Sequence, residues 1–110
     1  MAFELDLMIQ YLSRSDKVKN LVLKIDYPYK LPSSFFSLEG LELLELTNCD
    51  FKPLLKFNGF SMLKSLKFSN VTIASDLLQT LLSSCPLLMD VYLNYVVTTA
   101  KLAVEVDFWC

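Results

Sequence analysis

The sequence contains no histidine, only two glycines and three cysteines among its 110 residues. Without histidine, the Ser–His and Cys–His nucleophile pairs of many hydrolases cannot form. Gly40 and Gly59 lie too far apart for a glycine-rich phosphate-binding loop. Cys49, Cys85 and Cys110 include no pair with C-x-x-C spacing, so a zinc site is not expected. We therefore expect neither catalysis nor a cofactor, and we expect Cys49 and Cys85 to be buried thiols.

The sequence also lacks a basic run and a long apolar segment. Ten basic and twelve acidic residues are spread along the chain, so no nucleic-acid partner is expected. The longest uncharged stretch, Leu77–Met89, has 13 residues, whereas a membrane-spanning helix needs roughly 17–25. We therefore expect no membrane partner. Acidic rather than basic residues precede the first apolar segment, which argues against a secretory signal and favours an intracellular location, cytoplasmic or nuclear.

What the sequence does contain is a repeated apolar pattern, and its clearest copy is Leu41–Phe51. This segment reads L-x-x-L-x-L-x-x-C-x-F, the pattern of a leucine-rich repeat with cysteine where many repeats have asparagine. Apolar and polar residues alternate around Leu44 and Leu46, which predicts a short strand with one buried side. After this strand, the small or polar residues Asn48 and Cys49 permit a turn.

Three further copies lie in register with this one. The fourth position of the pattern falls at Leu21, Leu44, Leu66 and Val91, so successive repeats are 23, 22 and 25 residues apart, within the ~20–29 residues of leucine-rich repeats. One such unit cannot bury its apolar side alone, and copies therefore stack.

The predicted fold class is α/β, a short leucine-rich-repeat solenoid of about four repeats. Parallel strands would form the concave face, and helices or irregular segments would form the convex face. We expect a single domain over residues 1–110. The expected strands lie near residues 18–25, 41–47, 63–69 and 88–94.

Two helices and one short turn are expected between and before the strands. Residues 3–12 place Leu5, Met8, Ile9 and Leu12 on one apolar stripe and predict a helix. That helix is either a cap of the stack or the helical part of a preceding repeat.

Later in the chain, residues 75–84 predict a second helix, with Asp76 or Ser75 as its N-cap. The prolines in residues 28–32 exclude a long helix there, and residues 31–37 predict one short helical turn.

The tail, residues 96–110, does not fit the repeat. Residues 101–107 alternate and predict a strand with Leu102, Val104 and Val106 on one side. This strand follows the fourth repeat too soon to belong to a full fifth copy. A shortened repeat, a foreign C-terminal cap, and an end created by truncation or altered splicing are all consistent with this pattern.

Five segments carry a family resemblance. They are Ile9-Gln-Tyr-Leu-Ser-Arg14, Tyr29-Lys-Leu-Pro-Ser-Ser-Phe-Phe36, Leu44-x-Leu46-x-x-Cys49, Phe57-x-Gly59-Phe-x-x-Leu63-Lys-Ser-Leu66, and Leu81-Leu-Ser-Ser-Cys-Pro-Leu-Leu88. Together they resemble the leucine-rich region of plant F-box/LRR proteins, especially the group with a C-terminal FBD domain. The resemblance covers about residues 5–95, and the last segment is the most distinctive.

This resemblance implies a role in protein recognition. In that family the F-box binds a Skp-type adaptor of a cullin ubiquitin ligase, and the repeat region is thought to select the protein to be ubiquitinated. The sequence shows no F-box and no FBD domain, so we do not expect a Skp-type adaptor as a partner. What the resemblance implies here is a surface that binds an unidentified protein. The alternative is a leucine-rich scaffold or truncated family member with no ubiquitin-ligase role.

Equivalent residues of stacked parallel strands form ladders about 4.8 Å apart, and the concave face is where solenoids usually bind partners. Outward positions of the second to fourth strands therefore define the candidate binding residues. They are Leu43, Glu45, Thr47, Ser65, Lys67, Ser69, Asp90, Tyr92 and Asn94.

Within this set, Glu45 and Lys67 predict a cross-strand ion pair, whose simpler interpretation is a solvated pair without a partner role. Tyr92 and Leu43 are the candidate hot spots, because exposed aromatic and apolar groups have no solubility role. The alternative is that the tail covers Tyr92, which would then not be available to a partner.

Overall fold

The computed structural model describes the chain except for residues 1, 16, 54–56, 99–102 and 110. In chain order the elements are α1 (Ala2–Ser13), β1 (Asn20–Lys30), the 3-10 helix η1 (Ser33–Ser37), β2 (Leu43–Phe51), β3 (Ser65–Ile73), α2 (Ser75–Ser83), β4 (Asp90–Val97) and β5 (Ala103–Trp109).

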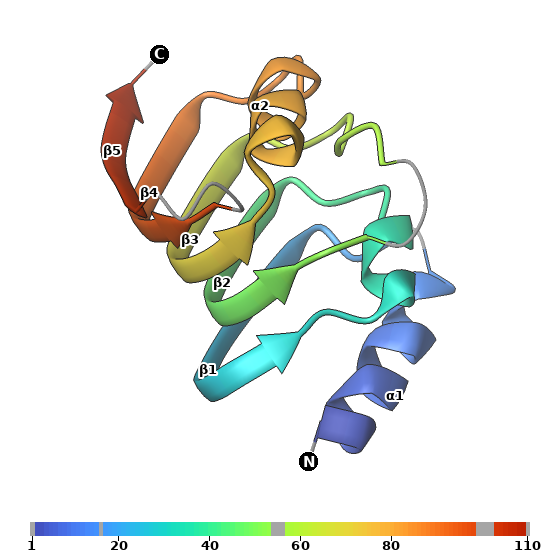
Figure 1. Cartoon of the computed structure of the whole chain (residues 1–110). Coiled ribbons are helices and arrows are strands. Elements are labelled where there is room, and N and C mark those ends of the chain that lie inside the picture. The colour runs from blue at the N-terminus through green and yellow to red at the C-terminus, as the bar shows by residue number, and fades with distance from the viewer. Residues whose placement is uncertain (1, 16, 54–56, 99–102, 110) are drawn as a thin grey trace.

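One sheet joins the five strands in chain order, from β1 to β5 (Figure 1). The first three pairings are parallel, and they have the register that the repeat pattern requires. Leu21 is opposite Leu44, Leu44 is opposite Leu66, and Leu66 is opposite Val91. The predicted fold class, an α/β leucine-rich-repeat solenoid, is confirmed.

The parallel strands continue beyond the positions at which the sequence indicated a turn. In β2, β3 and β4 the turn is a bend inside the strand. There Asn48, Asn70 and Tyr95 occupy equivalent positions with φ of 61°, 54° and 55°. Asparagine tolerates this left-handed conformation better than most residues do. Pairing resumes after the bend, for example between Asp50 and Thr72, and Figure 1 shows each bend as a sharp corner of the ribbon.

We call the paired residues before the bend the first arm of each strand and those after it the second arm. The first arms are residues 20–24, 43–47, 65–69 and 90–94, and the second arms are residues 29–30, 49–51, 71–73 and 96–97.

Side-chain amides connect the bends of neighbouring repeats. The Asn70 amide nitrogen donates to Asn48 Oδ1 at 2.6 Å, and the Asn48 amide nitrogen donates to the carbonyl oxygen of Ile25. The equivalent residue of β4 is Tyr95, which has no side-chain amide and is 56% exposed. The amide ladder therefore links the first three repeats.

A cluster of phenylalanines fills much of the core. The Phe51 ring centroid lies 5.9 Å from that of Phe35, 4.9 Å from Phe36, 5.7 Å from Phe57 and 5.8 Å from Phe68. Phe35 and Phe36 come from η1, so the short turn predicted over residues 31–37 packs against the second arms. Aromatic pairs of this kind contribute about 0.5–1.5 kcal/mol beyond the area they bury.

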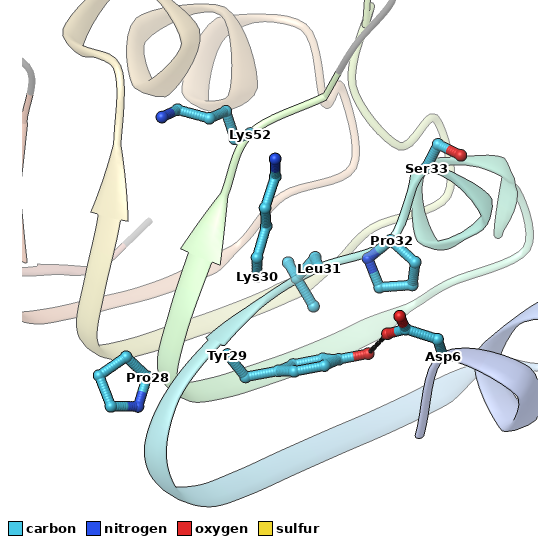
Figure 2. A pocket seen from close by; sticks show the side chains of 8 residues that line it. All are labelled: Asp6, Pro28, Tyr29, Lys30, Leu31, Pro32, Ser33 and Lys52. Carbon is cyan, nitrogen blue, oxygen red and sulfur yellow. Dashed lines mark hydrogen bonds between the residues drawn. The ribbon is translucent and has the colours of Figure 1, made fainter. Parts of the chain in front are cut away.

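The predicted N-terminal helix forms as α1, but its packed face is narrower than the apolar stripe suggested. Ile9 is 1% exposed, whereas Met8 is 55% exposed, so the placement of Met8 on the packed stripe was wrong. On the packed side, the Tyr29 hydroxyl of β1 donates a hydrogen bond to the Asp6 carboxylate (Figure 2). Met8 lies 200° around the helix axis from Asp6 and faces solvent.

The second predicted helix forms as α2, and its predicted N-cap was wrong. The N-cap residue is Ala74, which makes no side-chain cap hydrogen bond. Because the helix begins at Ser75, both expected cap residues already lie in its first turn. There Asp76 accepts a hydrogen bond from the Leu77 N–H at 2.9 Å, and its charge is favourable near the helix N-terminus. Across the described ranges, no helix is long and apolar enough to cross a membrane.

The tail forms β5, which pairs with β4 in the antiparallel direction. Tyr92 is opposite Asp107, and Val96 is opposite Val104. A shortened repeat would have added another parallel strand, so this alternative is wrong. β5 instead covers the strand edge that β4 would otherwise expose. Leu102, predicted to share a side with Val104, lies outside the described residues.

Candidate binding face on the first arms

The first arms bring the nine predicted residues together on one face of the sheet, and none of the nine is buried. Successive strands place them in three rows, which are Leu43–Ser65–Asp90, Glu45–Lys67–Tyr92 and Thr47–Ser69–Asn94. The fixed parallel register therefore gives a continuous surface with acidic, basic and aromatic groups in its middle row.

Glu45 is the centre of the charges on this face. Its Oε2 lies 4.0 Å from Lys67 Nζ, as the sequence predicted, and 3.6 Å from Lys24 Nζ. Sequence reasoning missed this second pair, in which Lys24, opposite Thr47 in the register, reaches Glu45 diagonally. The diagonal neighbour rule for strands would have found it. Both lysines are at least half exposed, so each pair contributes only about 0–1 kcal/mol.

Tyr92 is the large aromatic residue of this face. It is 38% exposed although β5 pairs with its own strand. Lys67 Nζ lies 5.4 Å from the centre of the Tyr92 ring, which is within the range of a cation–π contact. Leu43, the other predicted hot spot, is half-buried and offers less apolar surface.

Exposed apolar side chains lie in the segments that lead into the first arms of β3 and β4. Met62, Leu87 and Met89 are all exposed. The Met89 N–H donates to the Lys64 carbonyl at 2.8 Å, so these two residues are equivalent in neighbouring repeats. Sequence reasoning missed this group, although methionine and leucine outside the L-x-x-L positions were the available signal.

The two described cysteines are buried free thiols, as expected. Burial raises the pKa of the Cys49 thiol to about 11, and the thiol donates a hydrogen bond to the Thr47 carbonyl. Burial also raises the pKa of Cys85. Such thiols are protonated at neutral pH and are poor nucleophiles. Among the described residues, no group of three His, Cys, Asp or Glu residues could hold a metal ion.

These features define a leucine-rich-repeat solenoid with a mixed polar and aromatic face on its first arms. The sequence model of a family described as FBD-associated F-box protein At5g56370, LRR repeats, matches residues 5–105. The F-box/FBD/LRR-repeat protein At1g13570 of Arabidopsis thaliana is 38% identical over 93 residues, which are 84% of this chain and 22% of that protein. The chain belongs to this family of FBD-associated F-box proteins with leucine-rich repeats, so the resemblance seen in the sequence is confirmed.

The chain spans about a fifth of the length of that Arabidopsis relative. No solved structure matches the chain significantly.

Proposed function

We propose that the chain is a protein-interaction module whose partner binds the first arms of the sheet. The single observation that carries this proposal is the exposure of Tyr92 in the middle row, where Lys67 Nζ lies over its ring. Aromatic residues next to apolar and charged groups are typical of interface hot spots. A sheet with fixed register presents them in one arrangement, which lowers the entropic cost of binding.

The charged groups of the face suit such a role. Glu45 is paired with Lys24 and with Lys67, and both pairs contribute little stability because exposed ion pairs are weak. A partner with complementary charges can therefore replace these pairs at small cost, and the pattern of both signs disfavours partners with the wrong charges.

The finer proposal is that this face selects a protein for ubiquitination. Its support is membership of an F-box family over residues 5–105. The second candidate is a scaffold without a ligase role, which the same binding face supports equally well. The two proposals differ in the fate of the partner, since a ligase substrate is degraded and a scaffold partner is not.

A photo-crosslinking amino acid at position 92 tests the binding proposal, with position 95 as the matched control. Tyr95 is a more exposed tyrosine of the same strand, but it lies at the bend. A specific partner should be crosslinked from position 92 and not from position 95. Tyr92→Ala should then weaken binding of the purified partner about 30-fold or more, and Tyr95→Ala should change it less than twofold. Equal effects of the two variants would refute the proposal.

The same partner distinguishes the ligase from the scaffold. If it is a ligase substrate, its half-life in cells should lengthen both when the proteasome is inhibited and when Tyr92→Ala is introduced into the family protein that carries this region. An unchanged half-life in both experiments would exclude the ligase role, and only the scaffold proposal would remain.

A further inference from the structure

Helix α1 carries large apolar side chains on the side that faces away from the core. Its packed side holds Ile9, which is buried, whereas Phe3, Leu7 and Tyr11 are each at least half exposed. These three residues recur every fourth position, so they lie within about 80° of one another around the helix axis. We call them the outer stripe. A helix that is apolar on both sides is normally buried on both sides, so the outer stripe points to a partner.

The position of α1 in the fold leaves the outer stripe accessible. α1 packs against η1, and the hydrogen bond from Tyr29 to Asp6 joins it to β1. Figure 1 shows the helix at the β1 end of the stack, next to η1. None of the nine candidate residues on the first arms belongs to α1, so a partner on the outer stripe is distinct from the one proposed above.

The edge of β1 at the same end of the stack is unsuited to pairing with another strand. β1 is the first strand of the described sheet and has a partner on one side, β2. It contains Lys24, Pro28 and Lys30, and its register with β2 is irregular between Lys24 and Tyr29. Lysines, prolines and such irregularities are features that discourage pairing at sheet edges. At this end of the stack, a partner is therefore expected on the helix rather than on the strand.

Opposite charges lie at the two ends of the outer stripe. Glu4 is in the first turn of α1, and Arg14 directly follows its last residue. The Arg14 N–H donates to the Tyr11 carbonyl at 3.2 Å, so the chain is still turning there. Both side chains are exposed, and the ion pairs of the described residues include neither of them. A surface that is acidic at one end and basic at the other is complementary to a copy of itself that is rotated by a two-fold axis.

We propose that two copies of the chain pair through their outer stripes, with the two α1 helices antiparallel. The register that brings Glu4 beside Arg14 of the second copy also brings Leu7 beside Tyr11 of the second copy, because both pairs are centred on position 9. Arg14 then also lies near the ring of Phe3 of the second copy, where a cation–π contact can form. Charge and apolar contacts thus agree on one arrangement, which is what a two-fold interface requires.

The proposed dimer is weak, because one helix pair is smaller than a standard interface of about 1,200–2,000 Å². We expect a dissociation constant on the order of 10–100 μM. Sedimentation equilibrium of the chain from about 5 μM to about 500 μM covers this range. The mass should rise from that of one chain toward that of two and no further.

Two leucine variants locate the interface. Leu7→Glu should keep the mass of one chain at every concentration, whereas Leu87→Glu, at an exposed leucine before β4, should dimerise like the unmodified chain. Far-ultraviolet circular dichroism should show that both variants are folded, because both leucines are exposed. An additional leucine-rich repeat as the occupant of the outer stripe predicts a mass of one chain throughout for the unmodified protein. That result, or equal effects of the two variants, would overturn the proposal.

Two charge variants test the antiparallel register. Glu4→Arg makes both ends of the outer stripe basic, and Arg14→Glu makes both ends acidic. Each variant alone should dimerise about tenfold more weakly than the unmodified chain. Their equimolar mixture should recover the affinity of the unmodified chain, because opposite charges meet at both ends of the mixed dimer. A mixture that associates no better than the separate variants would show that the apolar contact has no fixed register, and would overturn the proposal.

Discussion

Replacing Asn48 by alanine tests the left-handed bend and the amide ladder together. Alanine is less stable than asparagine at a φ of 61°, by about 1 kcal/mol. The substitution also removes the hydrogen bonds to Ile25 and from Asn70, each of which contributes about 0.5–1.5 kcal/mol. We therefore expect Asn48→Ala to lower the free energy of unfolding by about 2–4 kcal/mol.

Two further substitutions at the same position separate these causes. Asn48→Asp keeps the acceptor for Asn70 and the tolerance of positive φ but loses the donor to Ile25, so it should cost about 0.5–1.5 kcal/mol. Asn48→Gly loses both hydrogen bonds but relieves the strain. It should be about 0.5–1 kcal/mol more stable than Asn48→Ala, because the relieved strain exceeds the added entropy of the unfolded chain.

Urea unfolding followed by far-ultraviolet circular dichroism measures these differences. With a denaturant slope of about 1–3 kcal/mol/M, a loss of 3 kcal/mol moves the midpoint by about 1–3 M. Asn58→Ala, at an exposed loop position, is the control and should change stability by less than about 0.5 kcal/mol. Equal stability of the glycine and alanine variants would refute the left-handed bend. An alanine variant as stable as the control would refute the ladder.

Three other substitutions or conditions test the core and the thiols. Leu66→Ala should cost about 2–5 kcal/mol in urea unfolding because Leu66 is fully buried in an inner repeat, and a change below about 0.5 kcal/mol would contradict the repeat register. Gly59→Ala should destabilise by about 1–3 kcal/mol, since φ is 94° and a Cβ would lie 3.3 Å from Cys85 Sγ. The folded-state pKa of Cys49 is raised from 9.0 to about 11, so its contribution to stability should be complete below pH 9 and lost between pH 9 and 11. The urea midpoint of unfolding should therefore fall as the pH rises through that range. Cys49→Ala, which lacks the thiol, should not show this fall.

The parallel sheet and its outward rows could be predicted because a repeat fixes its own register. Once Leu44 and Leu66 are recognised as equivalent, the pairing of Glu45 with Lys67 follows without any knowledge of the intervening segments. The nine candidate residues therefore lie on one face as predicted, while their role in binding stays a prediction.

The bend, the rotation of α1 and the direction of β5 could not be predicted, because each depends on contacts distant in sequence. Asn48 signalled a turn, but only the neighbouring strands make the pairing resume after it. Asp6 and Tyr29, whose hydrogen bond connects α1 to β1, are 23 residues apart. Alternation in the tail indicates a strand but not whether it runs parallel or antiparallel.

The antiparallel direction of β5 affects how further strands can join the stack at the β4 edge. In a purely parallel array each repeat offers the next one the same edge, so the repeat pattern contains no information on when to stop. Here the edge of β4 is occupied by a strand of the opposite direction. Another parallel strand, from any source, can pair with β4 only by displacing β5. Further stacking at this edge is thus a competition between strands, and conditions that weaken β5 should favour longer assemblies.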